Sequence, residues 1–132
     1  MEPIDRVWTW ITWHHAVEYV KQDLPQVESM DIRFPFFPGW ILRQIGSKAY
    51  AKEQETTKEL KANGIRIVKE KFDKGELFVI WAHRGSTDIF RISEGKLRSK
   101  VQEKINEITK QMMEENKDAP PSKKIGDELG TN

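Results

Sequence analysis

The sequence predicts an α+β domain in which helices flank a three-stranded antiparallel meander. Residues 65–72, 77–83 and 88–92 are rich in β-branched and aromatic side chains, as strands are. Gly75 and Gly85 lie between these runs and supply the positive φ that tight hairpin turns require. Residues 96–116 repeat apolar side chains every three or four positions, which is typical of a helix with one narrow buried stripe. The predicted order is therefore two N-terminal helices, three strands and a C-terminal helix.

Length and composition limit the classes of protein. The chain has 132 residues, no cysteine and a net charge of +1, so one core can form without disulfides, and cysteine-based catalysis or metal binding is excluded. We predict one domain over residues 1–116 and a disordered tail over 117–132, where Pro, Lys, Asp and Gly dominate. The sequence shows no signal-peptide pattern and no apolar run of about 20 residues, which predicts a cytoplasmic protein without a membrane span.

The N-terminal segment has two interpretations. Residues 7–13 are all strand-favouring, whereas a single helix over 5–23 would be apolar on two faces. Both apolar faces of such a helix have to be covered, so either the helix lies inside the fold or one face meets a partner. A short strand at 7–13 would instead give the element order βααβββα, which is similar to that of RelE/ParE-like toxins. That resemblance concerns element order and involves no residue motif.

The remaining helices and the sheet follow from local signals. Pro25 is expected to end the first element, and the proline-rich segment up to Pro38 to run extended over the surface. The second helix is expected to have an apolar first half, a solvated stretch over 52–59 and an end at the Asn63-Gly64 pair. The second strand is apolar on both faces, which indicates a central position. A bulge near Val68 would turn the apolar residues of the first strand to one face.

Candidate chemistry in the sequence is sparse. His14 and His15 are adjacent, so on a helix they point about 100° apart, and we expect that they cannot share a metal ion. His83, Ser86 and Asp88 include the residue types of a hydrolytic triad, but within a span this short a turn explains them better. We therefore predict no cofactor, no metal and a protein that is not an enzyme.

Aromatic residues point to an interaction module. Residues 1–40 contain four of the five tryptophans and three of the six phenylalanines, and clustered aromatics are typical anchors of protein interfaces. We predict a regulatory or interaction role in which the protein binds a partner protein or a second copy, as a homodimer. The predicted surface comprises Trp8, Trp10, Phe36, Phe37 and Trp40.

Basic residues on the predicted sheet support nucleic-acid binding as the alternative function. Residues 64–100 contain nine basic and five acidic side chains, and aromatics flanked by Arg and Lys are how single strands are commonly held. The candidate residues are Trp81, His83, Arg84, Arg91, Arg98 and Lys100. The pI of about 7.9 is lower than a dedicated nucleic-acid binder would have, and a charged sheet edge that prevents aggregation would explain the same residues.

Overall fold

The computed structural model describes residues 1–29 and 36–115, with 36–38 described by their backbone alone. The elements are α1 (Pro3–Glu28), α2 (Phe36–Ala62), β1 (Ile65–Asp73), β2 (Glu76–His83), β3 (Ser86–Ser93) and α3 (Glu94–Glu115), which confirms the predicted α+β class and order. The expected tail over 117–132 lies outside the described residues. No helix in the described part of the chain has the length and apolar character needed to cross a membrane.

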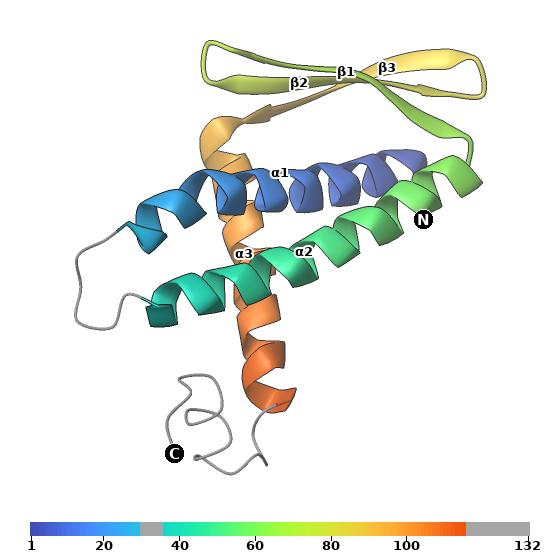
Figure 1. Ribbon diagram of the computed structural model, residues 1–132. Coiled ribbons are helices and arrows are strands. Elements are labelled where there is room, and N and C mark those ends of the chain that lie inside the picture. Colours follow the sequence, from blue (N-terminus) through green and yellow to red (C-terminus); the bar gives the residue numbers. More distant parts are fainter. Residues whose placement is uncertain (30–35, 116–132) are drawn as a thin grey trace.

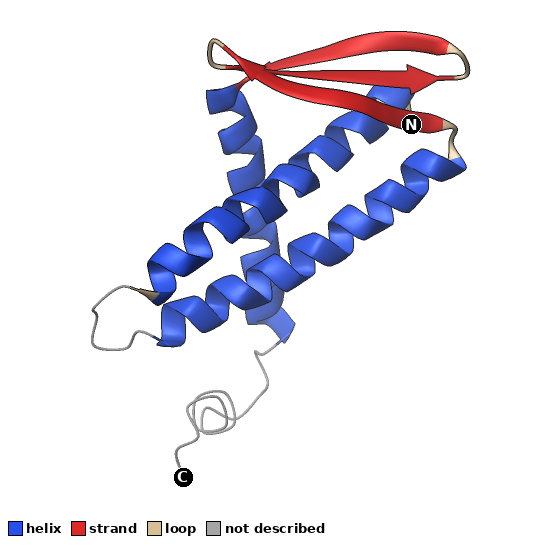
Figure 2. Ribbon diagram, turned by 45° about the horizontal axis from the view of Figure 1, so that its top comes forward, coloured by secondary structure: helices blue, strands red, loops and turns tan. Residues whose placement is uncertain are grey.

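The helices form one side of the molecule and the sheet forms the other. Helices α1 and α2 run antiparallel beside each other, and α3 crosses them (Figure 1). The sheet lies over α1, and the view in Figure 2 shows the same arrangement from another direction. One face of the sheet therefore contacts the helices, whereas no described element covers the other face.

Helix α1 lies inside the fold. The short strand considered at 7–13 is wrong, since these residues are helical, and the βααβββα order is not realised. The buried residues of α1 occupy more than one face of the helix: Val7, Ile11, Thr12, Trp13, His15, Ala16, Val17 and Val20. Burial from several sides outweighs the strand preference of Val, Ile, Thr and Trp, because propensity is weaker than tertiary packing.

Pro25 does not end α1, contrary to the prediction. The helix continues to Glu28, and the backbone N–H of Ser29 donates to the carbonyl of Pro25 over 3.1 Å. Pro25 lacks the backbone N–H that would bond to the carbonyl of Lys21, so the helix continues past it with this one hydrogen bond missing.

The stretch 52–59 of α2 is exposed at five of its eight residues, as expected, but one side of it packs. Thr56 is only 6% exposed, and Glu53 and Thr57 hydrogen-bond to side chains of α1. The expectation missed this side because it meets polar groups of α1, which an apolar pattern cannot reveal. The predicted end of the helix is confirmed: Asn63 follows the last helical residue, and Gly64 has a φ of +69°.

The sheet has the order β1-β2-β3, which confirms β2 as the central strand. Both hairpins close with two residues of positive φ, Lys74-Gly75 and Arg84-Gly85, as type I′ turns require. The predicted bulge is present, because the register shifts between Ile67 and Lys69 and leaves Val68 unpaired. Val68 itself nevertheless stays half exposed, so the bulge does not bury it.

The core lies between the inner face of the sheet and the helices. From β2 it receives Leu77, Val79 and Trp81, and from α3 it receives Leu97, Val101 and Ile108, which belong to the predicted stripe. The outer face of the sheet includes Ile89, which is 55% exposed. The sheet is thus stabilised by burial on one face only.

Candidate functional site

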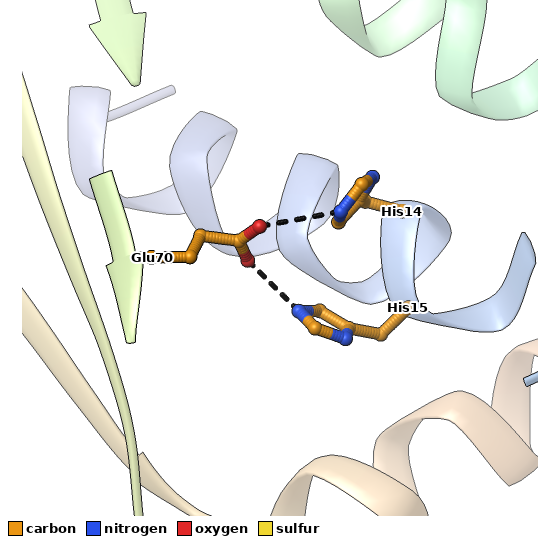
Figure 3. A group of neighbouring side chains, drawn as sticks. All are labelled: His14, His15 and Glu70. Carbon is orange, nitrogen blue, oxygen red and sulfur yellow. Dashed lines mark hydrogen bonds and ion pairs between the residues drawn. The ribbon is translucent and has the colours of Figure 1, made fainter. Parts of the chain in front are cut away.

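Two histidines of α1 face a carboxylate of β1. Glu70 is paired with Val79, whose side chain is fully buried on the inner face, so the register turns Glu70 toward α1 as well. The bulge at Val68 sets this register, because one residue more or fewer would turn Glu70 to the other face. His14 and His15 lie at the middle of α1, opposite this point of the strand (Figure 3).

Both imidazole rings reach the same carboxylate. Nε2 of His14 lies 3.2 Å from Oε2 of Glu70, and Nε2 of His15 lies 2.8 Å from Oε1 (Figure 3). His15 is 6% exposed, and Phe72 packs edge-on against its ring at 5.7 Å between centroids. Glu70 therefore holds α1 and β1 together through two hydrogen bonds.

The second nitrogen of His14 binds α2. Nδ1 lies 2.9 Å from Oε1 of Glu53, and the indole of Trp10 stacks on the imidazole at 4.6 Å with an angle of 9° between the planes. Nε1 of Trp10 in turn donates to the hydroxyl of Thr57 on α2. The ring of His14 is thus fixed by contacts with α1, α2 and β1.

The charges of this cluster are strongly coupled. The hydrogen bond to Glu70 raises the pKa of His14 to about 9, burial opposes this shift, and Glu53 adds to it. Burial alone would raise the pKa of Glu70, but the hydrogen bonds from His14 and His15 lower it to about 2. At neutral pH His14 is therefore an imidazolium that donates from both nitrogens, and Glu70 is ionised.

The cluster forms part of the wall of a cavity of about 620 Å³. The lining also includes Glu18 and Tyr19 of α1, the β1–β2 turn and the paired Glu94 and Arg98 of α3. Burial raises the pKa of the Tyr19 phenol, and the guanidinium of Arg98 partly offsets this effect. His14, His15 and Glu70 each present one ligand atom here, and these atoms lie within 4.8 Å of one another.

A second hollow, of about 600 Å³, lies beside β3 and shares no lining residue with the first. We call it the β3 groove. Trp8 of α1 and Phe90 of β3 stack in it at 5.2 Å between centroids, and Arg91, Lys96 and Lys100 supply positive charge. The groove therefore combines an aromatic pair with three basic side chains and one carboxylate, Glu76, which pairs with Arg91 at 3.2 Å.

A family model of the YhjD protein matches residues 5–113. The chain belongs to the YhjD family. No curated protein and no solved structure matches it. In this YhjD family protein the histidine cluster and the β3 groove both lie within the matched span.

The expectation that His14 and His15 cannot share a metal ion was based on their divergence on the helix, but in this YhjD family protein both rings approach one carboxylate. Their Cα–Cβ directions diverge, but long side chains allow both Nε2 atoms to converge on a carboxylate placed between them. Glu53 and Glu70 were missed because they lie 39 and 55 residues from their histidine partners. The sequence contained one signal that could have indicated this site. Glu70 is an acidic residue at a position of the first strand that faces the helices.

The aromatic residues predicted for partner binding have different surroundings. Trp8 is half-buried in the β3 groove, and Trp10 is half-buried between His14 and Thr57. Trp40 lies near the start of α2 and is also half-buried, whereas the side chains of Phe36 and Phe37 lie outside the described residues. Of the three described side chains, Trp8 lines the β3 groove.

The basic set predicted for nucleic acid is divided by the fold. Trp81 is 7% exposed on the inner face of the sheet, so its ring is inaccessible to a base. Arg98 lines the histidine cavity and pairs with Glu94, whereas Arg91 and Lys100 line the β3 groove. His83 and Arg84 lie apart from these, at the β2–β3 turn.

Proposed function

We propose that this YhjD family protein is a binding module that holds an acidic, extended segment of a partner protein in the β3 groove. The observation that carries the proposal is the stacked Trp8–Phe90 pair, which lines the groove beside an edge strand. Aromatic side chains at such a position are effective anchors, because they bury large area with few rotatable bonds.

The backbone of β3 supports an extended ligand. His83 and Ser86 close the two-residue hairpin as a hydrogen-bonded pair, and because pairs alternate, Thr87, Ile89 and Arg91 direct their backbone groups away from β2. The N–H of Ile89 instead bonds to the side chain of Asp88 over 2.8 Å. A polypeptide that adds as a fourth strand would satisfy the other outward backbone groups of this edge, which is the usual mode of strand addition.

Charge favours an acidic partner. Lys96 forms no ion pair with any described residue, and the pairs Arg91–Glu76 and Lys100–Glu103 are exposed and therefore weak. A second copy bound edge to edge would bring these like charges together, so a different, acidic chain fits better than self-association. The free backbone edge favours a polypeptide over a nucleic acid, which has no matching amides.

Selection from a random-peptide library on the immobilised protein tests this function. We expect enriched peptides to be acidic and rich in β-branched or aromatic residues. Methylation of alternate backbone nitrogens in such a peptide should abolish binding, because it removes the strand hydrogen bonds and leaves the charge. The unmethylated peptide is the control for this effect.

Charge reversal locates the site. Lys96→Glu with Lys100→Glu should abolish peptide binding, whereas Lys61→Glu with Lys110→Glu, at exposed positions outside the β3 groove, should preserve it. Enrichment of basic peptides, or equal binding by the two double variants, would contradict the proposal. Salt-sensitive binding of a single-stranded oligonucleotide without peptide binding would instead support the alternative function.

A further inference from the structure

We infer that His14, His15 and Glu70 form a binding site for a transition-metal dication such as Zn²⁺. This site is separate from the β3 groove, with which its cavity shares no residue. Two imidazoles and one carboxylate are a common ligand set for Zn²⁺ and for other first-row transition metals.

The positions of the ligand atoms are compatible with one ion. Ligands at about 2.0–2.2 Å from a tetrahedral Zn²⁺ lie about 3.3–3.6 Å from one another. Nε2 of His14 lies 3.2 Å from one oxygen of Glu70, and Nε2 of His15 lies 2.8 Å from the other. The three ligand atoms all lie within 4.8 Å of one another, so small side-chain rotations suffice to surround an ion.

Glu53 provides the outer support that metal-binding histidines usually have. A histidine that ligates through one nitrogen generally donates its other N–H to a carboxylate, which orients the ring and strengthens it as a ligand. Nδ1 of His14 makes this contact with Glu53 at 2.9 Å, and the stacked Trp10 restricts the ring further. The direction of Nε2 is therefore set before any ion binds.

Charge balance favours a dication. Glu53 and Glu70 carry two negative charges, and with both imidazoles neutral one dication makes the cluster neutral. Binding requires that Nε2 of each histidine gives up its proton, and the hydrogen bonds to Glu70 are replaced by bonds to the ion. Mg²⁺ and Ca²⁺ prefer ligand sets made of oxygen alone, so they should bind poorly here.

The site would remain open on one side. Three protein ligands leave a coordination position of a tetrahedral ion unfilled, and the cluster lines a cavity of about 620 Å³. A water molecule or a small anion could take that position. Arg98 also lines this cavity, where it pairs with Glu94 at 3.0 Å.

Nuclear magnetic resonance of the wild-type protein tests this inference, since the chain has only three histidines. Untagged, chelator-treated protein is titrated with Zn²⁺ while the imidazole carbon-bound protons are observed. We expect the signals of His14 and His15 to shift and to saturate at about one equivalent. His83, which lies at the far end of β2, should not shift, and Mg²⁺ should move none of the three.

Variants assign the ligands. Glu70→Gln should abolish Zn²⁺ binding by calorimetry, whereas Glu76→Gln, a matched change on β2, should leave it unchanged. Glu53→Gln should weaken binding roughly tenfold, at the low end for an outer partner, because the amide oxygen still accepts a hydrogen bond.

The inference is overturned if Zn²⁺ leaves the signals of His14 and His15 in place, in which case the cluster only joins helix and strand. It is equally overturned if all three histidines respond alike, or if the Glu70 and Glu76 variants bind equally. The wild-type spectra decide the matter even if a variant does not fold.

Discussion

His14 contacts side chains of α1, α2 and β1. Its two ring nitrogens bind Glu53 of α2 and Glu70 of β1, and Trp10 stacks on its face. Both carboxylates are largely shielded from solvent, so each depends on the imidazolium for compensation. Removing one member of a buried charge pair is costly, because the remaining charge is left without a partner.

The stability of the metal-free protein should depend on pH through this cluster. The pKa of His14 is raised to about 9, so its stabilisation is complete below its ordinary value of 6.5 and is lost as the pH rises through about 9. The pKa of Glu70 is lowered to about 2, so its contribution is present above 4.5 and is lost as the pH falls through about 2. Glu53 and His15 also face the cluster, and Glu18 and Arg98 line the same cavity.

We therefore predict that His14→Gln destabilises the protein most between about pH 4.5 and 6.5. The expected loss is at most about 3.5 kcal/mol, from about 1.4 kcal/mol per unit of pKa, and it should shrink steadily toward pH 10. Urea unfolding of wild type and variant, in the presence of a chelator, measures the difference at each pH. A difference that stays constant over this range would show that the pKa of His14 is the same in the folded and the unfolded protein.

At the scale of elements, α1 and α2 form the most extensive helix pair of the molecule. Gly46 of α2 permits close packing, because a Cβ there would lie 2.8 Å from Cγ1 of Val20 on α1. Glycine inside a helix normally costs about 1 kcal/mol relative to alanine. The absence of a side chain at this position is therefore required by the neighbouring helix.

We predict that Gly46→Ala destabilises the protein by about 1–2 kcal/mol despite its better helix propensity, because the branched Val20 side chain cannot move away easily. Adding Val20→Ala should reduce the clash and yield a favourable coupling energy in a double-mutant cycle. Gly95→Ala in α3 is the matched control, since nothing lies within 4 Å of its Cβ, and it should be neutral or slightly stabilising. Thermal unfolding of these variants, and of the single Val20→Ala variant that the cycle requires, measures these effects.

At the scale of the whole molecule, the sheet has a buried face and a face without a described cover. Alternate residues of β3 sample these two environments: Ile92 is 6% exposed, whereas Ile89 is 55% exposed. The positive charge of the outer face includes Arg91, which lies over the ring of Phe78 at 5.0 Å. Charged side chains on such a face oppose aggregation of an open sheet.

This asymmetry predicts a contrast between two isoleucines of the same strand. Ile92→Ala should cost about 2–5 kcal/mol, because it leaves a cavity in the core. Ile89→Ala should cost less than about 1 kcal/mol, because its side chain is already half in water. Equal losses in urea unfolding would mean that the outer face is covered in solution, for example by a second copy.

Much of the fold follows from local patterns. The spacing of Leu97, Val101 and Ile108 predicted α3, and Gly75 and Gly85 predicted the two hairpins, because both signals depend on residues close in the chain. The doubly apolar pattern of the N-terminal segment indicated an element covered on two sides. Whether residues 7–13 form a helix or a strand was undecided, since burial among other elements outweighs the local preference.

The candidate sites depend on tertiary structure. The sequence by itself determined that α1 presents two adjacent histidines and that β1 carries an acidic residue. Only the packing of α1 against α2 and β1 decided that Glu53 and Glu70, 39 and 55 residues from their partners, meet those histidines. The stacking of Trp8 on Phe90 is likewise a contact between a helix and a strand. The physical reason is the same in each case: periodicity reports which face of an element is buried, and the partner of that face is set by the packing of the whole chain.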